Sequence, residues 1–423
     1  MKILWFANTP CGASVYLNSS IVTGGWLESL EKELKKESTI DLHVAFYWVE
    51  RLNSFTFNDV TYHPIYRPGT KSKAHKFLSR LLGFKNSDSS EVLLINKLVR
   101  EINPDLIHVF GSEENFGLIV LEFQQKTILT IQGILNPIYN KLYAGFPKQI
   151  INKYEPLIRK LSLNSLKYKS KSILRKSRRE KIIYKNLLFC SGRTEWDQRV
   201  ANILNPNIQY FRINEILRDS FYNKKWDKKE FNKRISILTI MSDTYYKGIE
   251  TIVHTAILLK ELNTFNFSWN IVGLTKRSNT VKIVTKWLGV DSQSLNLNLY
   301  GRMDEQQIIK LMLEADIYCQ VSHIENSPNS LCEAMILGMP IVATFVGGTS
   351  TMLENNKEGI LVQEGEPYSI AGAIVEISNN FSKAKALGDN ARTTAAQRHS
   401  KTIIVENTKS VYHRIHAQSL DLK

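Results

Sequence analysis

Apolar runs and amphipathic stretches alternate through the second half of the chain. Runs rich in β-branched and aromatic residues fall at 235–241, 267–274, 297–301, 316–322, 340–348 and 358–365. Between them, apolar residues recur at helical spacing, as at Ile249, Ile252, Val253 and Ala256. Continuous apolar strands that alternate with helices predict a parallel sheet covered on both faces. The pattern therefore predicts a doubly wound α/β domain.

The first half of the chain repeats this alternation. A helix is predicted at 26–37, directly after the turn formed by Thr23, Gly24 and Gly25. Further strands are predicted at 2–8, 41–48, 105–111, 126–133 and 186–192. The first half therefore predicts a second sheet of the same kind.

Together the two halves predict two Rossmann-like domains that face a central cleft. We place the N-terminal domain at 1–215 and the C-terminal domain at 216–400. The linker should lie within 205–233, a stretch rich in Asn and Lys. Residues 401–423 predict one more helix, which we expect to pack back on the N-terminal domain.

Composition narrows the class of protein. The chain has 423 residues, of which 43% are hydrophobic and 22% charged, enough for two cores and too apolar for a mostly disordered chain. No apolar run approaches the roughly 18 residues of a membrane-spanning helix, and the N-terminus lacks a secretory pattern. Two of the four cysteines, Cys190 and Cys319, lie in apolar runs, as reduced core cysteines do. We therefore expect a cytoplasmic protein.

The net charge of +15 predicts a negatively charged partner. Residues 153–185 carry twelve Lys or Arg against two Glu. One interpretation is a solvated helical hairpin on the first domain. The other is a surface for anionic lipid headgroups or a phosphate-bearing acceptor, which would hold the protein peripherally on the inner face of the plasma membrane. The sequence leaves both open.

One segment combines loop, helix start and two carboxylates. Glu325 follows the strand at 316–322, and Glu333 stands eight positions later in a predicted helix. Ser327 and Pro328 read as the N-cap and first residue of that helix. The free N–H groups at its start, on Asn329, Ser330 and Leu331, suit a diphosphate. The carboxylates suit the hydroxyls of a sugar on the same ligand.

This segment resembles a known family. E-x7-E followed by "SLCEAMILGMPIVATFVGG" is similar to the retaining glycosyltransferase family 4, which has the GT-B fold. Further matching stretches are "YYKGIETIV", "LYGRMDEQQIIKLMLEADIYCQVS", "EGILVQEGEPYSIAGAI", "TGGW", "NPDLIHVFG" and "TILTIQG". The resemblance covers nearly the whole chain and is strongest from about 235 to 375.

The resemblance implies a role for each matching residue. Glu333 would bind the ribose of a nucleotide, Glu325 would contact the donor sugar, and Lys247 would hold the diphosphate. Gly24 and Gly25 would let the backbone of the first domain approach the donor. Each residue also has a non-functional interpretation. Glu333 could be an ordinary helix-surface residue, Lys247 a solvated turn lysine, and Gly24 with Gly25 a plain turn.

The chain departs from the family pattern at several positions. Ser242 stands where the family commonly has an arginine, so a second cation such as Arg302 or Lys276 would have to assist Lys247. Gln132 replaces a histidine near the reacting sugar carbon and cannot titrate. The linker "INEILRDSF" replaces the usual N-G-V-D pattern, which leaves the hinge open.

His108 ends the strand at 105–111 and has two interpretations, a structural histidine or a base on the acceptor side. No D-x-D motif and no metal-ligand spacing of histidines occurs in the sequence, so we expect neither a metal nor a cofactor. G-x-x-x-x-G-K-[ST] and G-x-G-x-x-G are also missing, which argues against an NTPase or a simple dinucleotide enzyme.

The resemblance thus implies a retaining glycosyltransferase that moves a hexosyl unit from a UDP-linked donor to a hydroxyl of a saccharide or lipid-linked saccharide, in cell-surface polysaccharide synthesis. Two alternatives remain. A nucleotide-sugar 2-epimerase on the same fold would need acid and base groups and a histidine that face the sugar. A nucleic-acid-binding protein is suggested by the charge alone, without a supporting motif, and we expect no nucleic-acid partner.

Overall fold

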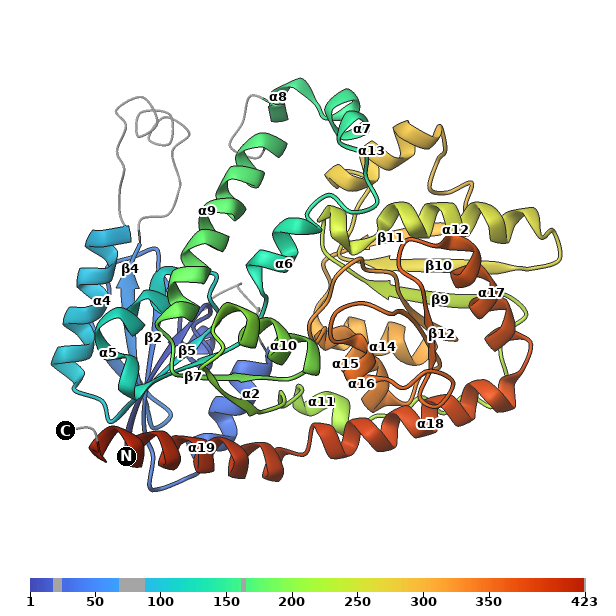
Figure 1. Cartoon of the computed structure of the whole chain (residues 1–423). Helices are drawn as coiled ribbons and strands as arrows, with labels where there is room; N and C mark the ends of the chain where they lie inside the picture. The colour runs from blue at the N-terminus through green and yellow to red at the C-terminus, as the bar shows by residue number, and fades with distance from the viewer. Residues whose placement is uncertain (18–24, 68–87, 161–164, 422–423) are drawn as a thin grey trace.

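The computed structural model describes residues 1–17, 25–67, 88–160 and 165–421, which form two α/β domains side by side (Figure 1). Each domain has one sheet with helices on its faces. Within these ranges, no helix has the length and apolar character needed to cross a bilayer. All four cysteines are buried and free of disulfides.

The N-terminal sheet has eight strands in the order β3-β4-β2-β1-β5-β6-β7-β8. All neighbours pair in parallel except β3 with β4. The strands are β1 (Lys2–Ala7), β2 (Asp41–Trp48), β3 (Phe55–Phe57), β4 (Val60–Tyr66), β5 (Leu106–Phe110), β6 (Thr127–Thr130), β7 (Phe189–Gly192) and β8 (Gln209–Arg212). Nearly every residue of β1, β5, β6 and β7 is buried, as in a parallel sheet covered on both faces.

Helices and short 3₁₀ segments connect these strands. They are α1 (Ala13–Tyr16), α2 (Gly25–Leu34), α4 (Asp88–Ile102), η1 (Asn115–Ile119), α5 (Val120–Phe123), η2 (Gln124–Lys126), α6 (Leu135–Asn140), α7 (Lys148–Tyr154), α8 (Leu157–Lys160), α9 (Leu166–Lys185) and α10 (Glu195–Leu204). The start of α10 is fixed by a capping box, in which Thr194 Oγ1 accepts from the Asp197 amide and Asp197 accepts in return.

The C-terminal sheet has six parallel strands in the order β11-β10-β9-β12-β13-β14. They are β9 (Ile235–Ile240), β10 (Phe267–Val272), β11 (Leu297–Gly301), β12 (Ile317–Gln320), β13 (Ile341–Thr344) and β14 (Ile360–Val362). The other elements from the linker onward are α11 (Asp219–Tyr222), η3 (Tyr245–Lys247), α12 (Ile249–Glu261), α13 (Asn279–Leu288), α14 (Glu305–Glu314), α15 (Asn329–Leu337), α16 (Thr349–Met352), α17 (Pro367–Ser378), α18 (Phe381–Arg398) and α19 (Lys401–Asp421).

Each strand predicted from apolar periodicity is present in the structure. The periodicity missed β3, β4 and β8. Strand β8 lies inside 205–233, the stretch expected to hold the linker, so the crossing between the sheets is confined to the residues between β8 and β9. β8 was hidden because none of its four residues is buried and their exposure does not alternate.

The chain returns to the N-terminal domain at its end. α18 runs beneath the C-terminal domain, and α19 continues beneath the N-terminal domain (Figure 1). Ile404, Val411, Tyr412 and Ile415 of α19 are buried in the same apolar cluster as Trp5 of β1. The terminal helix therefore fastens one domain to the other.

A second segment of the N-terminal half reaches the C-terminal domain. Phe146 and Ile151, which flank the start of α7, are buried in the apolar cluster of the C-terminal domain. The Phe146 ring contacts Tyr245 and Trp287 at centroid distances of 5.2 and 6.0 Å. Within the basic stretch 153–185, Tyr154 and Leu166 pack against this same cluster, whereas α9 packs against α6, η1 and α10 of the N-terminal domain. The stretch therefore contacts both domains and is not a hairpin on the first domain alone.

Tyr412→Phe should weaken the attachment of α19. The Tyr412 hydroxyl accepts a hydrogen bond from Trp5 Nε1 at 3.1 Å and pairs with His108 Nδ1 at 2.6 Å, all in the core. Its loss leaves two buried groups unpaired, so we expect a loss of about 2 kcal/mol in the free energy of unfolding, measured by urea denaturation. Tyr300→Phe, at a side chain that is 44% exposed on β11, is the control. Equal effects of the two substitutions would contradict this role.

Candidate active site

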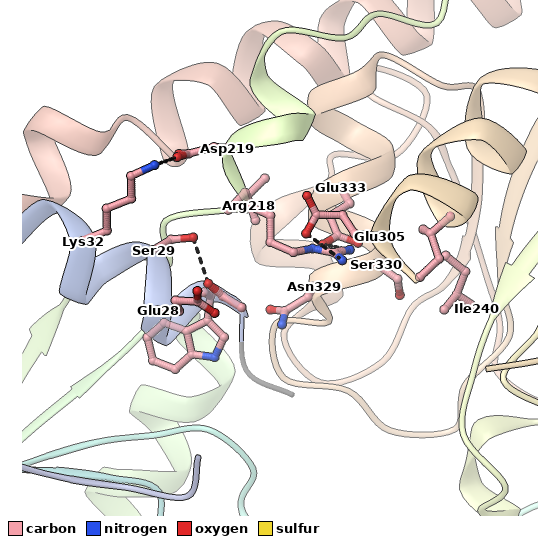
Figure 2. Close-up of a pocket in the computed structure, with 14 residues that line it drawn as sticks. Glu28, Ser29, Lys32, Arg218, Asp219, Ile240, Glu305, Asn329, Ser330 and Glu333 are labelled. Carbon is pink, nitrogen blue, oxygen red and sulfur yellow. Dashed lines mark hydrogen bonds and ion pairs between the residues drawn. The ribbon is translucent and has the colours of Figure 1, made fainter. Parts of the chain in front are cut away.

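Two cavities lie between the domains, on either side of the start of α15. The first, here the Glu333 cavity, has a volume of about 390 Å³. It is lined by Gly25, Trp26, Glu28, Ser29 and Lys32 of α2, Leu217, Arg218 and Asp219 of the linker region, and Ile240, Glu305, Ile308, Asn329, Ser330 and Glu333 of the C-terminal domain (Figure 2). It thus brings together elements of both domains and the linker.

The second, here the Glu325 cavity, has a volume of about 180 Å³. It is lined by Gln132, Gly133, Ile134, Ile138, Trp196, Tyr246, Lys247, Ile324, Glu325, Asn326 and Ser327. These residues follow β6, β7, β9 and β12, so the carboxyl ends of strands from both sheets meet here. Doubly wound sheets bind ligands at this edge.

The helix α15 begins one residue later than predicted. Pro328 is its N-cap, no side chain caps this end, and Ser327 Oγ instead donates to Glu215 Oε1 at 2.6 Å. Asn329 and Ser330, its first two residues, line the Glu333 cavity. Amides in a first helical turn have no intrahelical acceptor, so this end can receive an anion. Leu331 does not fit the predicted donor role, because its amide donates to Pro328 O and its side chain is fully buried.

Glu333 is held by an arginine of the linker. Its side chain is 7% exposed, and Glu333 Oε1 accepts from Arg218 Nε at 2.9 Å and from Arg218 Nη2 at 2.7 Å (Figure 2). Burial raises the pKa of Glu333 to about 7, against the lowering effect of Arg218. This carboxylate is therefore poorly solvated, and both bonds from Arg218 go to the same oxygen, Oε1. Hydroxyl donors of a ligand would stabilise its negative charge.

Arg218 also leaves little room for a side chain at position 25. A Cβ on Gly25 would come within 2.8 Å of Arg218 Cδ, so a larger residue would have to displace the Arg218 side chain that holds Glu333. Gly24, predicted with it to let the backbone approach the donor, lies outside the described residues. Arg218 Nη1 also lies 3.4 Å from Glu305 Oε2, which makes the arginine a bridge between two carboxylates.

The rest of the Glu333 cavity is rich in carboxylates. Burial raises the pKa of Glu28, and the negative charge of nearby Glu305 raises it further. Asp219 pairs with Lys32 and Lys401 at the outer rim. Acceptors outnumber cations, so this cavity suits the hydroxyls and N–H groups of a nucleoside better than its phosphates.

The Glu325 cavity holds an ion pair. Lys247 Nζ donates to Glu325 Oε1, and Ser322 Oγ donates to the same oxygen at 2.7 Å. Burial opposes the charge on Lys247, yet Glu325 and the electrostatic effect of Tyr246 keep its pKa above the ordinary value. A compact cation therefore stands at the wall of this cavity, next to the loop that leads into α15.

Gln132 faces this ion pair from the N-terminal domain. Over the described residues, its buried Nε2 has no hydrogen-bond partner, which leaves a free donor at the cavity. The neighbouring Gln132 carbonyl accepts from Asn326 Nδ2 at 3.2 Å, and Asn326 Oδ1 accepts from Thr194 Oγ1 at 2.8 Å. Asn326 thereby joins the loop after β12 to two loops of the N-terminal domain.

Two further predicted residues lie away from both cavities. His108 is 2% exposed, and its ring nitrogens bond Tyr412 and Thr130, each at 2.6 Å. Burial lowers its pKa to about 3, so the idea of an acceptor-side base is corrected to a packing role. Arg302 is exposed at the end of β11 and lines neither cavity, so this position gives no support to its predicted help with the diphosphate.

One group of potential metal ligands occurs among the described residues. Glu215, Cys332 and His399 bring their ligand atoms within 4.8 Å of one another. Arg193 and Arg398 flank Glu215, and burial raises the pKa of the Cys332 thiol well above its usual range. Two cations and a protonated thiol fit an ion-pair network rather than a metal site.

Several lining residues escaped the sequence analysis. Arg218 lies in a linker without periodicity, and only its departure from the usual hinge pattern marked the region. Trp196 and Tyr246 add aromatic faces to the Glu325 cavity, as sugar sites often have, but single aromatic residues next to a helix start or turn look like core. Asn326 could have been found, since it directly follows Glu325.

Glu333→Gln should change how stability depends on pH. The folded-state pKa of about 7 lies above the ordinary value of about 4.3, so the folded wild type binds the extra proton and loses stability as the pH rises between these values. Glutamine does not titrate. The free energy of unfolding of the variant relative to the wild type should therefore rise by about 1–3 kcal/mol from pH 4.5 to pH 8 in urea denaturation. A constant difference would refute the buried state of Glu333.

Comparison with known proteins finds a family model that matches part of the chain. Residues 221–394 match the family model described as "Glycosyl transferases group 1". The amylovoran biosynthesis glycosyltransferase AmsK of Erwinia amylovora is 25% identical over 183 residues, which are 42% of either chain. The chain spans about half the length, or less, of the curated relatives it matches.

Two solved structures match over almost their whole length. Sucrose-phosphate synthase of Thermosynechococcus elongatus superposes with a TM-score of 0.66 at 14% identity, covering 99% of both chains. HepE of Anabaena in complex with UDP-glucose superposes with a TM-score of 0.60 at 15% identity, covering 97% of this chain and 99% of that one. The protein therefore has the GT-B fold, and its C-terminal domain is similar in sequence to group 1 glycosyltransferases.

Proposed function

We propose that the protein is a retaining, family 4-type glycosyltransferase that moves a hexosyl unit from a UDP-linked sugar to a hydroxyl of a saccharide acceptor. The observation that carries this proposal is the start of α15, which has the Glu333 cavity on one side and the Glu325 cavity on the other. Residues 326–330 line the two cavities in turn, apart from Pro328. One extended ligand can therefore occupy both cavities, with its central part next to the start of α15.

The lining of each cavity suggests which part of the donor it takes. The carboxylate-rich Glu333 cavity accepts hydrogen bonds from ribose hydroxyls and from the base. The diphosphate would rest on the uncapped amides of Asn329 and Ser330, near the Lys247 ammonium. The hexose would enter the Glu325 cavity, against Trp196, Tyr246 and the free amide of Gln132.

The transfer breaks the bond between the anomeric carbon and a diphosphate oxygen and forms a bond to the acceptor oxygen. Lys247 and the start of α15 would stabilise the negative charge on the departing diphosphate. Glu325 would stabilise the positive charge that develops on the sugar ring. The acceptor proton passes to the diphosphate on the same face of the sugar, which retains the anomeric configuration. Closure of the two domains over the donor would exclude water.

Charge neutralisation by this chain's own groups supports a site without a metal or cofactor. Lys247 and the helix start supply the positive potential that a divalent ion would otherwise give. The relatives support the wider role: AmsK is named for amylovoran biosynthesis, and another match, CapM of Staphylococcus aureus, for capsular polysaccharide biosynthesis. These names support our proposal that the reaction belongs to cell-surface polysaccharide synthesis.

The rival 2-epimerase needs a histidine that faces the sugar. His323 is the histidine of the loop that carries Glu325, but its Nε2 bonds Glu250 Oε1 at 2.5 Å and it does not line the cavity. Gly145 also approaches this pair, since a Cβ there would lie 2.6 Å from His323 Nε2. The geometry therefore favours the transferase.

UDP should raise the thermal stability of the protein. At a hundred times its dissociation constant, the nucleotide adds about 2.7 kcal/mol to the free energy of unfolding. Glu333→Gln and Lys247→Gln each remove a charged partner of the ligand and should weaken UDP binding about 10- to 100-fold, measured by calorimetry. Lys282→Gln, at an exposed lysine of α13, is the matched control. Equal UDP binding by all three variants and the wild type would contradict the proposed donor site.

Product analysis separates transfer from epimerisation. With a panel of UDP-hexoses and a saccharide acceptor, we expect a new glycosidic bond with the anomeric configuration of the donor, detected by NMR. Release of a 2-epimerised free sugar from the donor alone would replace the transferase with the epimerase, and an inverted product would refute retention.

A further inference from the structure

A groove on the N-terminal domain lies outside the two cavities. It has a volume of about 580 Å³ and runs between α6, α9 and α10. α9 contacts both α6 and α10, so the three helices form its walls. The proposed reaction uses none of the groove, and its walls combine cations with apolar side chains that are partly buried or, at Ile203, exposed.

The cations belong to a stripe along α9. Lys171, Arg175, Arg178, Lys181 and Lys185 follow one another at intervals of three or four residues, so they share one face of the helix, and all five are exposed. Among the ion pairs of the described residues, none involves any of the five. Like charges at this spacing destabilise a helix by a few tenths of a kcal/mol per pair. Such a stripe is suited to an anion supplied from outside the chain.

The groove adds apolar walls to two of these cations. Arg178 and Lys181 stand on one side, and Leu174, Val200 and Ile203 lie along the rest. The Ile203 side chain is 84% exposed, an unusual exposure for isoleucine beside a cationic helix. Arg199, the third cation of the groove, is already paired with Glu195 at 2.7 Å. The groove therefore offers two charges without an ion-pair partner and an apolar wall.

The groove also adjoins the reaction cavity. On α6, Ile138 lines the Glu325 cavity while Pro137 and Tyr139 line the groove. On α10, Trp196 lines the cavity and Val200 the groove. On α10, Trp196 and Val200 are four residues apart and share one face of the helix, separated by about one turn, roughly 5.4 Å. A molecule held in the groove could extend a polar end along this face of α10 to the sugar.

We propose that this groove binds the phosphate and the adjoining hydrocarbon chain of an anionic lipid, and so presents a lipid-linked acceptor to the Glu325 cavity. Arg178 and Lys181 hold the phosphate, and the chain lies against Leu174, Val200 and Ile203. The identity of the lipid as acceptor rests on the proposed function, but binding of the lipid does not. A nucleic acid would use the cations and leave the apolar wall uncovered.

The test is co-sedimentation of the full chain with vesicles of phosphatidylglycerol in phosphatidylcholine. The wild type should bind these vesicles and leave pure phosphatidylcholine vesicles unbound. Arg178→Gln with Lys181→Gln should weaken binding on the order of thirty-fold, from the typical effect of two cations near an anionic surface. The matched control is Lys282→Gln with Lys286→Gln, two exposed lysines at helical spacing on α13, which should bind as the wild type.

A neutral substitution separates the lipid chain from a simple charge effect. Ile203→Ser keeps every charge and removes an exposed apolar side chain, so it should weaken vesicle binding about tenfold and leave the melting temperature unchanged. Millimolar inorganic phosphate should fail to displace the wild type from vesicles, because it lacks the chain.

Three results would overturn the proposal. If the variant of Arg178 and Lys181 and the control variant of Lys282 and Lys286 lose vesicle binding equally, the loss is a non-specific effect of charge. Full binding by Ile203→Ser would show that no chain enters the groove. Tighter binding of a single-stranded oligonucleotide, lost with Arg178 and Lys181, would assign the groove to nucleic acid. Because no donor is present, a failure here is independent of the UDP experiment on the donor site.

Discussion

A buried carboxylate at the start of the linker fixes how the two domains meet. Glu215 is fully buried, and the guanidinium groups of Arg193 and Arg398 lie 3.4 and 3.9 Å from its Oε2. Despite burial, these two cations hold the pKa of Glu215 well below its ordinary range. Arg193 belongs to the N-terminal domain and Arg398 ends α18. A buried charge without partners is costly, so linker, domain and terminal helix must stay together.

The same carboxylate sets the position of the candidate site. Glu215 Oε1 accepts from Ser327 Oγ at 2.6 Å, and Ser327 immediately precedes the N-cap of α15. This bond takes the hydroxyl that would otherwise cap the helix, so the start of α15 is left open at the gap between the domains. The ion-pair network therefore has a chemical consequence, because it keeps a positive helix end available for an anion.

The sequence revealed the parts that obey short-range rules. Strand periodicity located most strands of both sheets, and the E-x7-E segment placed Glu325 and Glu333 near one helix start. That the two carboxylates line separate cavities, and not one shared crevice, could not be read from the sequence. Contacts between residues far apart in the chain could not be read. Arg218 bonds Glu333 across 115 positions, and Tyr412 bonds His108 across 304, which turned a candidate base into a core residue. The groove on α9 likewise depends on how α6 and α10 pack, although its charges were visible from the start.

The most direct test of the central claim is a crystal structure of the protein with UDP. The ribose hydroxyls should lie within hydrogen-bond distance of Glu333, and diphosphate oxygens should meet the amides of Asn329 and Ser330, with Arg218 shifted or shared. UDP bound away from the start of α15, or a ribose that makes no contact with Glu333, would contradict the account.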